Sequence, residues 1–358
     1  MHGYKLEKME NNNLESEQEQ EQERRVAAAE FERLKALGTG KFKEKKYEEA
    51  IKYYDAAADA IYSADGDTSS DPTRLSYYVV CKSNAAQCCI NLNDFEGAIG
   101  YASSAILKDP TNAKALYRRG TSFMATTRFD SAIDDLRSCI ALPLDPGTKR
   151  DVEKELKNAI NKCLNDSIIA GDLEKTKSLL EEGTDFNYRT QEGYSFLMLA
   201  SKQGHLDIVG MLLSKGANIH DKDTTDGYSS LMIASQEGCL SVVELLLSKG
   251  ANIHDKTTTH GYTSLMIASQ QGHMSVVELL LSKGANIHDR DTTHGYSSLF
   301  LATRDGHFKI RDILEKWYVT IMLIVLQELL QGDLSNIDYP DFFVNGTCAW
   351  QPKNVHSA

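Results

Sequence analysis

The chain has 358 residues, 41% of them hydrophobic and only six of them proline, which excludes a wholly disordered protein and allows two or three helical domains. Its formal net charge of -12 argues against nucleic acid as the main partner, and we find no basic patch interleaved with aromatic residues. The longest late apolar run, residues 317–327, is too short to span a bilayer, so no membrane role is expected.

The cysteines and the start of the chain indicate a compartment. There are seven cysteines, an odd number, and no Cys-x-x-Cys pair occurs among them. Most of them lie in apolar helical patterns, which favours reduced and buried thiols over disulfides. Residues 1–25 are polar and acidic, unlike a secretory signal. We therefore expect a cytoplasmic protein.

Residues 1–146 divide into a tail and a helical array. Residues 1–26, with three consecutive asparagines and alternating Glu and Gln, predict a disordered acidic, Gln-rich tail. From there a helical pattern with small residues recurs at Ala50, Ala98 and Ala132. The last two are 34 positions apart, and the longer first interval contains a loop-like insertion around residues 63–72. Small residues at these positions allow two helices to pack closely.

This pattern resembles three tetratricopeptide repeats over residues 27–146. The resemblance implies antiparallel helix pairs stacked into a superhelix. Residues 147–164 follow it, with an apolar stripe of Val152, Leu156, Ile160 and Cys163. They predict a solvating or linker helix between two domains.

The second half of the chain repeats one phrase, Gly-Tyr followed by Ser or Thr and an apolar run, every 34 residues from Gly193. A second phrase, Lys-Gly-Ala-Asn, keeps the same step. In each period a short helix with a Ser or Thr in position to cap it ends at a Gly, and a second helix and a loop follow. A fixed period of this kind predicts a stacked array in which each unit buries its apolar face against its neighbours.

These units resemble the ankyrin repeat, with Met or Phe in place of the family's His and no Thr-Pro pair. The resemblance implies about five units over residues 165–317, the first of them partial. An amphipathic segment, residues 318–330, is expected to form a capping helix, and residues 331–358 show no clear pattern. The expected fold is therefore all-α: a tetratricopeptide superhelix followed by an ankyrin stack with short hairpin loops.

The resemblance also implies a binding site in the first array. Similar units in cytosolic co-chaperones bind the C-terminal Glu-Glu-Val-Asp tail of heat-shock chaperones, of the heat shock protein 90 or 70 type, through a two-carboxylate clamp. The clamp needs Lys and Asn four positions apart in the first helix, Asn in the second unit, and Lys and Arg four apart in the third. The matching positions are Lys35, Thr39, Asn84, Lys114 and Arg118, with Thr39 in place of Asn.

Spacing alone supports part of this clamp. Lys114 and Arg118 are at i and i+4 and so share one helix face. Cations on such a face can hold a terminal carboxylate and an Asp side chain with charge-assisted hydrogen bonds. The plainer interpretation is that both are solvated surface charges.

The ankyrin half offers a second candidate surface. A tyrosine follows the first Gly of each unit, and in ankyrin arrays that position faces the concave surface: Tyr194, Tyr228, Tyr262 and Tyr296. Aromatic rows suit protein interfaces, so we expect this row to be exposed and to form a partner face. Recent duplication of the units explains the recurrence equally well.

Other sites are not expected. The repeated His220, His254 and His288 lie on different units, and stacked units about 8–10 Å apart keep them too far apart for one metal ion. His205, His273 and His307 follow the helix-stop Gly and indicate structural capping. Catalytic signatures are absent from the sequence, and residues 38–41 only weakly resemble a phosphate loop. We expect no cofactor, no metal and no enzymatic activity.

Two functions remain open from the sequence. The first is a co-chaperone-like adaptor, in which the first array binds a chaperone tail and the ankyrin face binds a second protein. The second is a general scaffold with no chaperone link, which the Thr at position 39 favours. An enzyme subunit with its activity in the C-terminal tail is a third and much weaker alternative.

Overall fold

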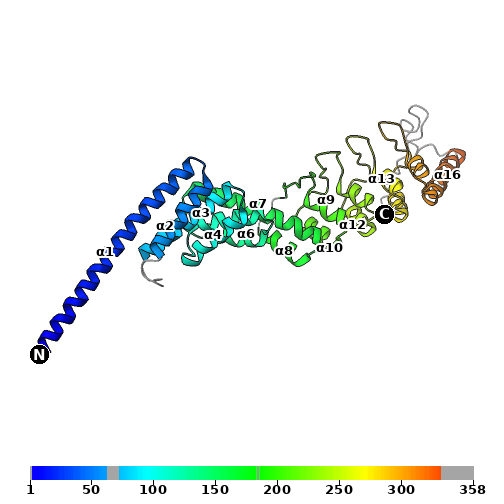
Figure 1. The fold of residues 1–358 in the computed structure, drawn as a ribbon. Coiled ribbons are helices and arrows are strands. Elements are labelled where there is room, and N and C mark those ends of the chain that lie inside the picture. Colours follow the sequence, from blue (N-terminus) through cyan, green and yellow to red (C-terminus); the bar gives the residue numbers. More distant parts are fainter. Residues whose placement is uncertain (1, 63–71, 183, 185, 332–358) are drawn as a thin grey trace. The chain divides into compact units, whose positions relative to one another are not determined.

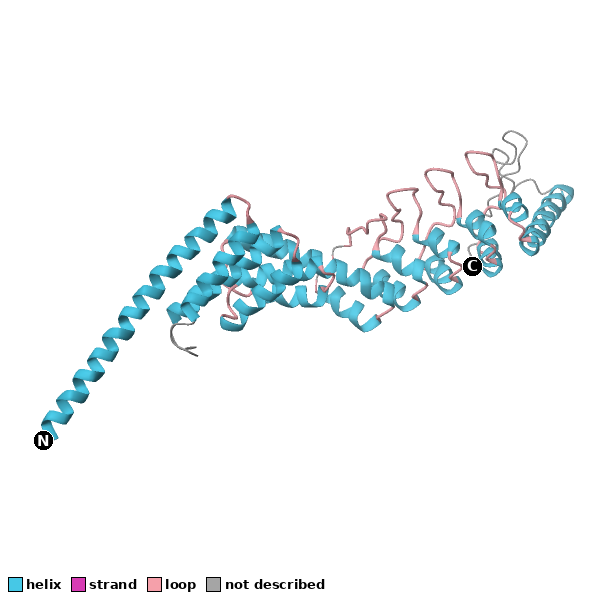
Figure 2. Ribbon diagram, viewed as in Figure 1, coloured by secondary structure: helices cyan, strands magenta, loops and turns pink. Residues whose placement is uncertain are grey.

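A computed structural model describes residues 2–62, 72–182, 184 and 186–331. In these residues it contains sixteen α-helices, α1–α16, and two isolated β-bridges in place of any longer strand (Figures 1 and 2). The chain divides into two compact units, residues 1–163 and 164–358. The all-α expectation is confirmed, and each unit is treated by itself below.

The first unit consists of helix pairs in which each helix packs on the next along the chain. Ala50, Ala98 and Ala132, the small residues of the repeated pattern, are fully buried at these helix–helix contacts. The insertion expected around residues 63–72 lies almost wholly outside the described residues. The helices are α1 His2–Lys43, α2 Tyr47–Tyr62, α3 Pro72–Asn91, α4 Phe95–Lys108, α5 Ala113–Ala125 and α6 Phe129–Ile140.

The expected disordered tail is instead helical, because α1 begins at His2 and continues through residues 2–26 into the first repeat. The composition explains this difference. The segment is rich in Glu and Gln, which are good helix formers, and the first proline of the chain is Pro72. Polarity argued for disorder, but nothing in these residues ends a helix that has already begun at the repeat.

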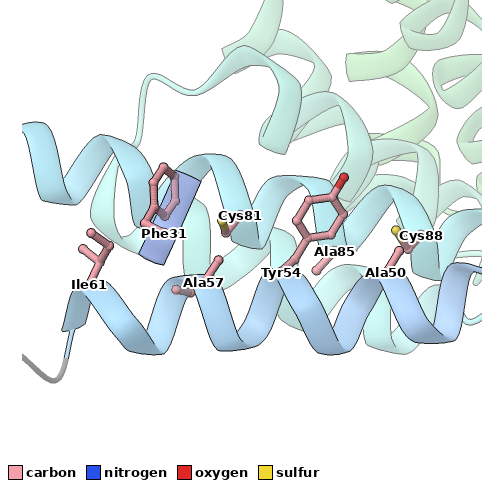
Figure 3. Packing of buried hydrophobic residues seen from close by; sticks show 9 residues of the cluster. Phe31, Ala50, Tyr54, Ala57, Ile61, Cys81, Ala85 and Cys88 are labelled. Atoms are coloured by element: carbon pink, nitrogen blue, oxygen red, sulfur yellow. The ribbon is translucent and has the colours of Figure 1, made fainter. Parts of the chain in front are cut away.

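The core between α1, α2 and α3 depends on a close approach of α1 to α2 at Gly38. Phe31, Ala57 and Cys81 are fully buried there, and the side chains of these three helices meet in Figure 3. A Cβ on Gly38 would lie only 2.9 Å from the ring of Tyr54. Glycine at position 38 therefore lets α1 lie against this ring.

Between the two arrays the chain forms one helix where two segments were expected. Helix α7 runs from Pro146 to Ala170 and so includes both the predicted linker helix and the first helix of the partial ankyrin unit. No Gly or Pro interrupts residues 148–170, so no residue there ends the helix. The predicted boundary at residue 164 therefore falls inside a helix.

The second unit contains the ankyrin-type helix pairs. A Ser or Thr caps the first helix of each full pair as expected, with its hydroxyl oxygen accepting a hydrogen bond from the amide three residues later at 3.3–3.4 Å. After the end of α7 the helices are α8 Leu173–Glu181, α9 Phe196–Gln203, α10 Leu206–Ser214, α11 Ser230–Gln236, α12 Leu240–Ser248, α13 Ser264–Gln271, α14 Met274–Ser282, α15 Ser298–Arg304 and α16 Phe308–Gln331.

Ion pairs connect the hairpin loops of successive repeats. Each joins a basic residue of one loop to an aspartate of the next: Arg189 to Asp221 at 2.5 Å, Lys222 to Asp255 at 3.6 Å and Lys256 to Asp289 at 2.8 Å. These aspartates follow His220, His254 and His288, the histidines considered above for a metal site. The recurrence of Asp at this position thus has a structural explanation.

Histidines after the helix-stop Gly also connect successive repeats. We expected them to cap their own helices, and they do not. His273 Nε2 lies 2.7 Å from the carbonyl oxygen of Gln236 in the preceding unit, and His307 Nε2 lies 2.9 Å from that of Gln270. The corresponding contact of His205 is longer, 3.4 Å to Ile169. The helix-stop Gly of the preceding repeat has no side chain and so leaves room for each ring.

The third ankyrin-type repeat has Cys239 at the position of these histidines, and its thiol does not make the same hydrogen bond. We expect Cys239→His to raise the free energy of unfolding by about 0.5–1.5 kcal/mol, the net contribution of one hydrogen bond. The ring should fit, because Gly204 stands where Gly238 and Gly272 receive the other rings. Urea denaturation of the full chain measures this gain, and Cys239→Ala is the control that adds no bond. Equal stability of the two variants would contradict this role of the histidines.

The expected separate capping helix, residues 318–330, is not a separate element. It continues the second helix of the last unit as α16. Together with residues 284–288, its residues Trp317, Ile321 and Ile324 line an apolar cavity of about 120 Å³, so this part of α16 lies beside the preceding unit. Phe300, at the position where Met198 and Met266 are fully buried, is 44% exposed. The array therefore ends with an exposed aromatic side chain.

Candidate peptide-binding site

The five clamp positions lie on the first helices of the three repeats. Lys35 and Thr39 are on α1, Asn84 is on α3, and Lys114 and Arg118 are on α5. Residues of α3 contact both α1 and α5, so these helices are neighbours within the unit. The local fold thus places all five positions along one row of adjacent helices.

Arg118 joins α5 to α3 and is half-buried. Its guanidinium donates hydrogen bonds to the Ser83 carbonyl at 2.7 Å, to Ser83 Oγ at 2.6 Å and to Gln87 Oε1 at 3.1 Å. Burial lowers the pKa of this guanidinium. All three acceptors are neutral, and we find no carboxylate paired with Arg118 among the described residues. A partly desolvated cation without a counter-ion carries an energetic cost, and an anionic ligand would offset that cost.

The neighbouring cations are neutralised within the protein. Arg119 forms a bidentate pair with the buried carboxylate of Asp135, with both distances 2.7 Å. Lys82 pairs with Asp55 at 2.7 Å, and the same carboxylate accepts a hydrogen bond from Tyr101. These cations are part of the packing, and Arg118 differs from them in having only neutral partners.

Thr39 is engaged with its own helix. Its hydroxyl donates to the carbonyl of Lys35 at 2.9 Å and lies 3.3 Å from the Tyr54 hydroxyl. A hydroxyl has one hydrogen, so in this arrangement Thr39 has none to donate to a ligand, and Tyr54 donates to Thr39. The Asn that the resemblance implies here would present two amide hydrogens instead.

The remaining clamp positions are accessible to different degrees. Lys114 is exposed one turn before Arg118, and Asn84 is half-buried beside Ser83. Lys35 forms a long ion pair with Glu32 at 3.4 Å, and its ammonium lies 5.2 Å from the centre of the Phe31 ring. Such an exposed pair contributes little to stability, so Lys35 can exchange this partner for a ligand at little cost.

Sequence reasoning missed three residues of this site: Tyr54, Ser83 and Gln87. Ser83 and Gln87 are four positions apart and flank Asn84 on α3, so their spacing could have indicated a shared face. Tyr54 had no such signal, because it lies on α2 and reaches Thr39 across the close approach at Gly38. Together these residues hold Arg118 and Thr39 in place.

The thiols of this unit are unsuited to chemistry. Burial raises the pKa of Cys81 and Cys89 to about 12 and that of Cys88 to about 11. They are therefore protonated at neutral pH and poor nucleophiles. Among the described residues we find no group of three or more His, Cys, Asp or Glu that could hold a metal ion.

The tyrosine row of the second unit is half-buried, whereas the sequence predicted an exposed row. Tyr194 has the ammonium of Lys202 over its ring at 5.2 Å, and burial raises the pKa of the Tyr228 phenol. Tyr296 stacks between His294 and Phe300, with ring centres 4.9 and 4.2 Å away. Each ring is thus partly used in packing and presents only part of its surface to a partner.

Comparisons with known proteins agree with the repeats of the second unit. A family model of ankyrin repeats in three copies matches residues 164–257, and a model of the single ankyrin repeat matches residues 260–292. The second array thus carries ankyrin repeats, as predicted. The tetratricopeptide-type helix pairs precede them in the chain.

Three curated relatives are similar over part of the chain. Sperm-associated antigen 1 of Mus musculus is 32% identical over 131 residues, 36% of this chain and 13% of that protein. The peptidyl-prolyl cis-trans isomerase FKBP42 of Arabidopsis thaliana is 34% identical over 118 residues, 32% of this chain and 31% of that protein. The isomerase FKBP4 of Bos taurus is 30% identical over 114 residues, 30% of this chain and 24% of that protein. The chain therefore spans less than a third of the length of each.

No helix in the part of the chain that the structure describes has the length and apolar character needed to cross a membrane.

Proposed function

We propose that the chain is a non-catalytic adaptor of the cytoplasm. Its first unit binds the acidic C-terminal peptide of a heat-shock chaperone, of the heat shock protein 90 or 70 type, and its ankyrin face binds a second protein. The observation that carries the proposal is Arg118, a half-buried guanidinium whose hydrogen-bond acceptors are all neutral.

An acidic peptide end fits the charges of this site. Lys114 lies on the same face of α5 as Arg118 and is exposed, so the two cations can address one carboxylate each. Asn84 supplies an amide on the adjacent helix, and Lys35 adds a further cation on α1. A peptide ending in Asp offers the terminal carboxylate and the side-chain carboxylate that such a set requires.

The alternative is a general scaffold with no chaperone link, and Thr39 supports it. Its hydroxyl hydrogen is directed to the Lys35 carbonyl, so one of the five expected donors is missing. With four donors left, the site can still bind an acidic peptide, although with less selectivity for a terminal carboxylate. The distinction between the two functions is therefore whether the terminal carboxylate itself is recognised.

Amidation of the peptide should separate these functions. We expect a free-acid peptide ending in Glu-Glu-Val-Asp to bind the full chain about tenfold to a hundredfold more tightly than its C-terminal amide, because hydrogen bonds to charged groups contribute about 1.5–3 kcal/mol. Isothermal titration calorimetry at constant salt measures both. Lys114→Ala should weaken binding of the free-acid peptide by a similar factor. Lys52→Ala, which removes one exposed charge from α2, is the matched control.

Equal affinity for the acid and the amide, with Lys114→Ala without effect, would exclude the clamp and leave the general scaffold. Affinity should also fall as salt is added, because the site is partly exposed.

A further inference from the structure

A polar pocket of about 250 Å³ opens on the ankyrin unit between the second and third repeats. Tyr194 and Lys202 line it from the second repeat, and Asp226, Tyr228 and Glu237 from the third. Two half-buried tyrosine side chains thus meet carboxylates in one concave space.

The charges of the pocket favour a cation. One lysine, Lys202, faces three carboxylates, of which Asp223 is occupied in shaping the hairpin: its Oδ1 accepts hydrogen bonds from three successive amides at 2.9–3.0 Å. Asp226 and Glu237 have no ion pair or side-chain hydrogen bond within the described ranges. The Tyr194 ring already holds the Lys202 ammonium at 5.2 Å, which shows that this ring face is accessible to a cation.

The neighbouring repeat shows that the fold does not require these carboxylates. Thirty-four positions along the chain, both tyrosines recur, as Tyr228 and Tyr262, but Asp226 becomes His260 and Glu237 becomes Gln271. The buried aspartate becomes Thr257, whose hydroxyl accepts the Tyr262 amide at 2.9 Å and so serves the same hairpin. One repeat further on, Asp291 and Asp305 take the places of Asp223 and Glu237, but His294 takes that of Asp226, and Asp305 is paired with Arg304 at 2.7 Å. The full set of three carboxylates is therefore particular to the pocket between the second and third repeats.

We propose that this pocket binds a basic side chain, arginine or lysine, from an extended segment of the ankyrin-side partner. The cation lies against the rings of Tyr194 and Tyr228 and pairs with Asp226 and Glu237, and the exposed Lys202 side chain moves aside into solvent. This inference rests on the proposed role of the ankyrin face in protein binding and names the chemistry of that partner.

The test uses a minimal probe and the residues of the neighbouring repeat. The full chain, labelled with carbon-13 in its tyrosine rings, is titrated with acetyl-Gly-Arg-Gly-amide and with acetyl-Gly-Gln-Gly-amide. Signals are assigned with Tyr194→Phe and Tyr228→Phe. We expect a saturable shift of both signals with the arginine peptide alone, and binding weaker by at least about tenfold in the double variant D226H/E237Q. Because these replacements occur naturally one repeat later, the variant should have the same melting temperature as the parent chain.

The converse variant, H260D/Q271E, should gain a second arginine-sensitive site that shifts Tyr262. No saturable shift with the arginine peptide, equal shifts with the glutamine peptide, or unchanged binding in D226H/E237Q would overturn the proposal. Failure here is separable from failure of the clamp, because the acidic peptide is tested on the other unit by calorimetry.

Discussion

Replacing Arg119 with methionine is expected to lower the free energy of unfolding by about 3–5 kcal/mol, the cost of leaving one partner of a buried ion pair alone. Asp135, which Arg119 holds in a bidentate pair, is only 5% exposed and would lose both charge-assisted bonds. The Arg119 side chain is 23% exposed, so some water can reach the carboxylate and the loss should fall toward the lower end. Urea denaturation of the full chain measures it.

The same substitution at Arg118 is the matched control and should have the opposite profile. Arg118→Met removes a half-buried cation that has no carboxylate partner, which offsets part of the loss of its three hydrogen bonds to neutral acceptors. Its cost to stability should therefore be clearly smaller than that of Arg119→Met, which leaves a buried carboxylate unpaired. Affinity for the acidic peptide should fall by about tenfold to a hundredfold. If Arg118→Met destabilised the fold as much as Arg119→Met, Arg118 would be a packing residue, and the main support for the clamp would be lost.

This pair of neighbours shows where sequence reasoning about the site was sufficient and where it was not. The positions of Lys114 and Arg118 on one helix face follow from the i, i+4 spacing, and the structure places them so. The distinction between Arg118 and Arg119 does not follow from spacing, because it depends on Asp135 of α6 and Ser83 of α3. Such partners come from other elements and become visible only in the folded chain.

The fold was predictable from the repeats because each unit carries its own periodicity and its own stop signals. What our interpretation of the sequence missed was where helices continue. Helix α7 passes through the predicted boundary at residue 164, and α16 continues beyond Trp317, since no Gly or Pro interrupts either. A change in the role of a segment need not coincide with the end of a helix. Residues such as Gly and Pro indicate only where a helix ends.

The half-burial of the tyrosine row has a similar origin. Position within the repeat indicated which side the rings lie on, but it could not indicate that Lys202 and Phe300 would cover part of Tyr194 and Tyr296. Those contacts depend on residues that differ from one unit to the next. The repeated tyrosine is therefore weaker support for an interface than the pair of carboxylates Asp226 and Glu237, both of which are replaced in the next repeat.

Leu265→Ala should cost about 2–5 kcal/mol of stability, the range for emptying a core leucine site. Leu265 is 1% exposed on α13, and α13 packs against both α11 and α15, so the lost contacts involve both neighbouring repeats. Because a stacked array is stabilised through its interfaces, the loss should appear in the unfolding of the whole ankyrin unit. Denaturation followed by circular dichroism, with the midpoint and slope fitted together, measures it.

The matched control is Leu299→Ala, the same position one repeat later. Leu299 is only half-buried on α15, where the adjacent Phe300 is exposed although its counterpart Met266 is fully buried. Truncation there removes fewer contacts, so the cost should be clearly smaller than at Leu265. If both substitutions cost the same, burial between repeats would not be what distinguishes the two sites. If Leu265→Ala cost only a few tenths of a kcal/mol, the repeats would be stabilised from within rather than by stacking on their neighbours.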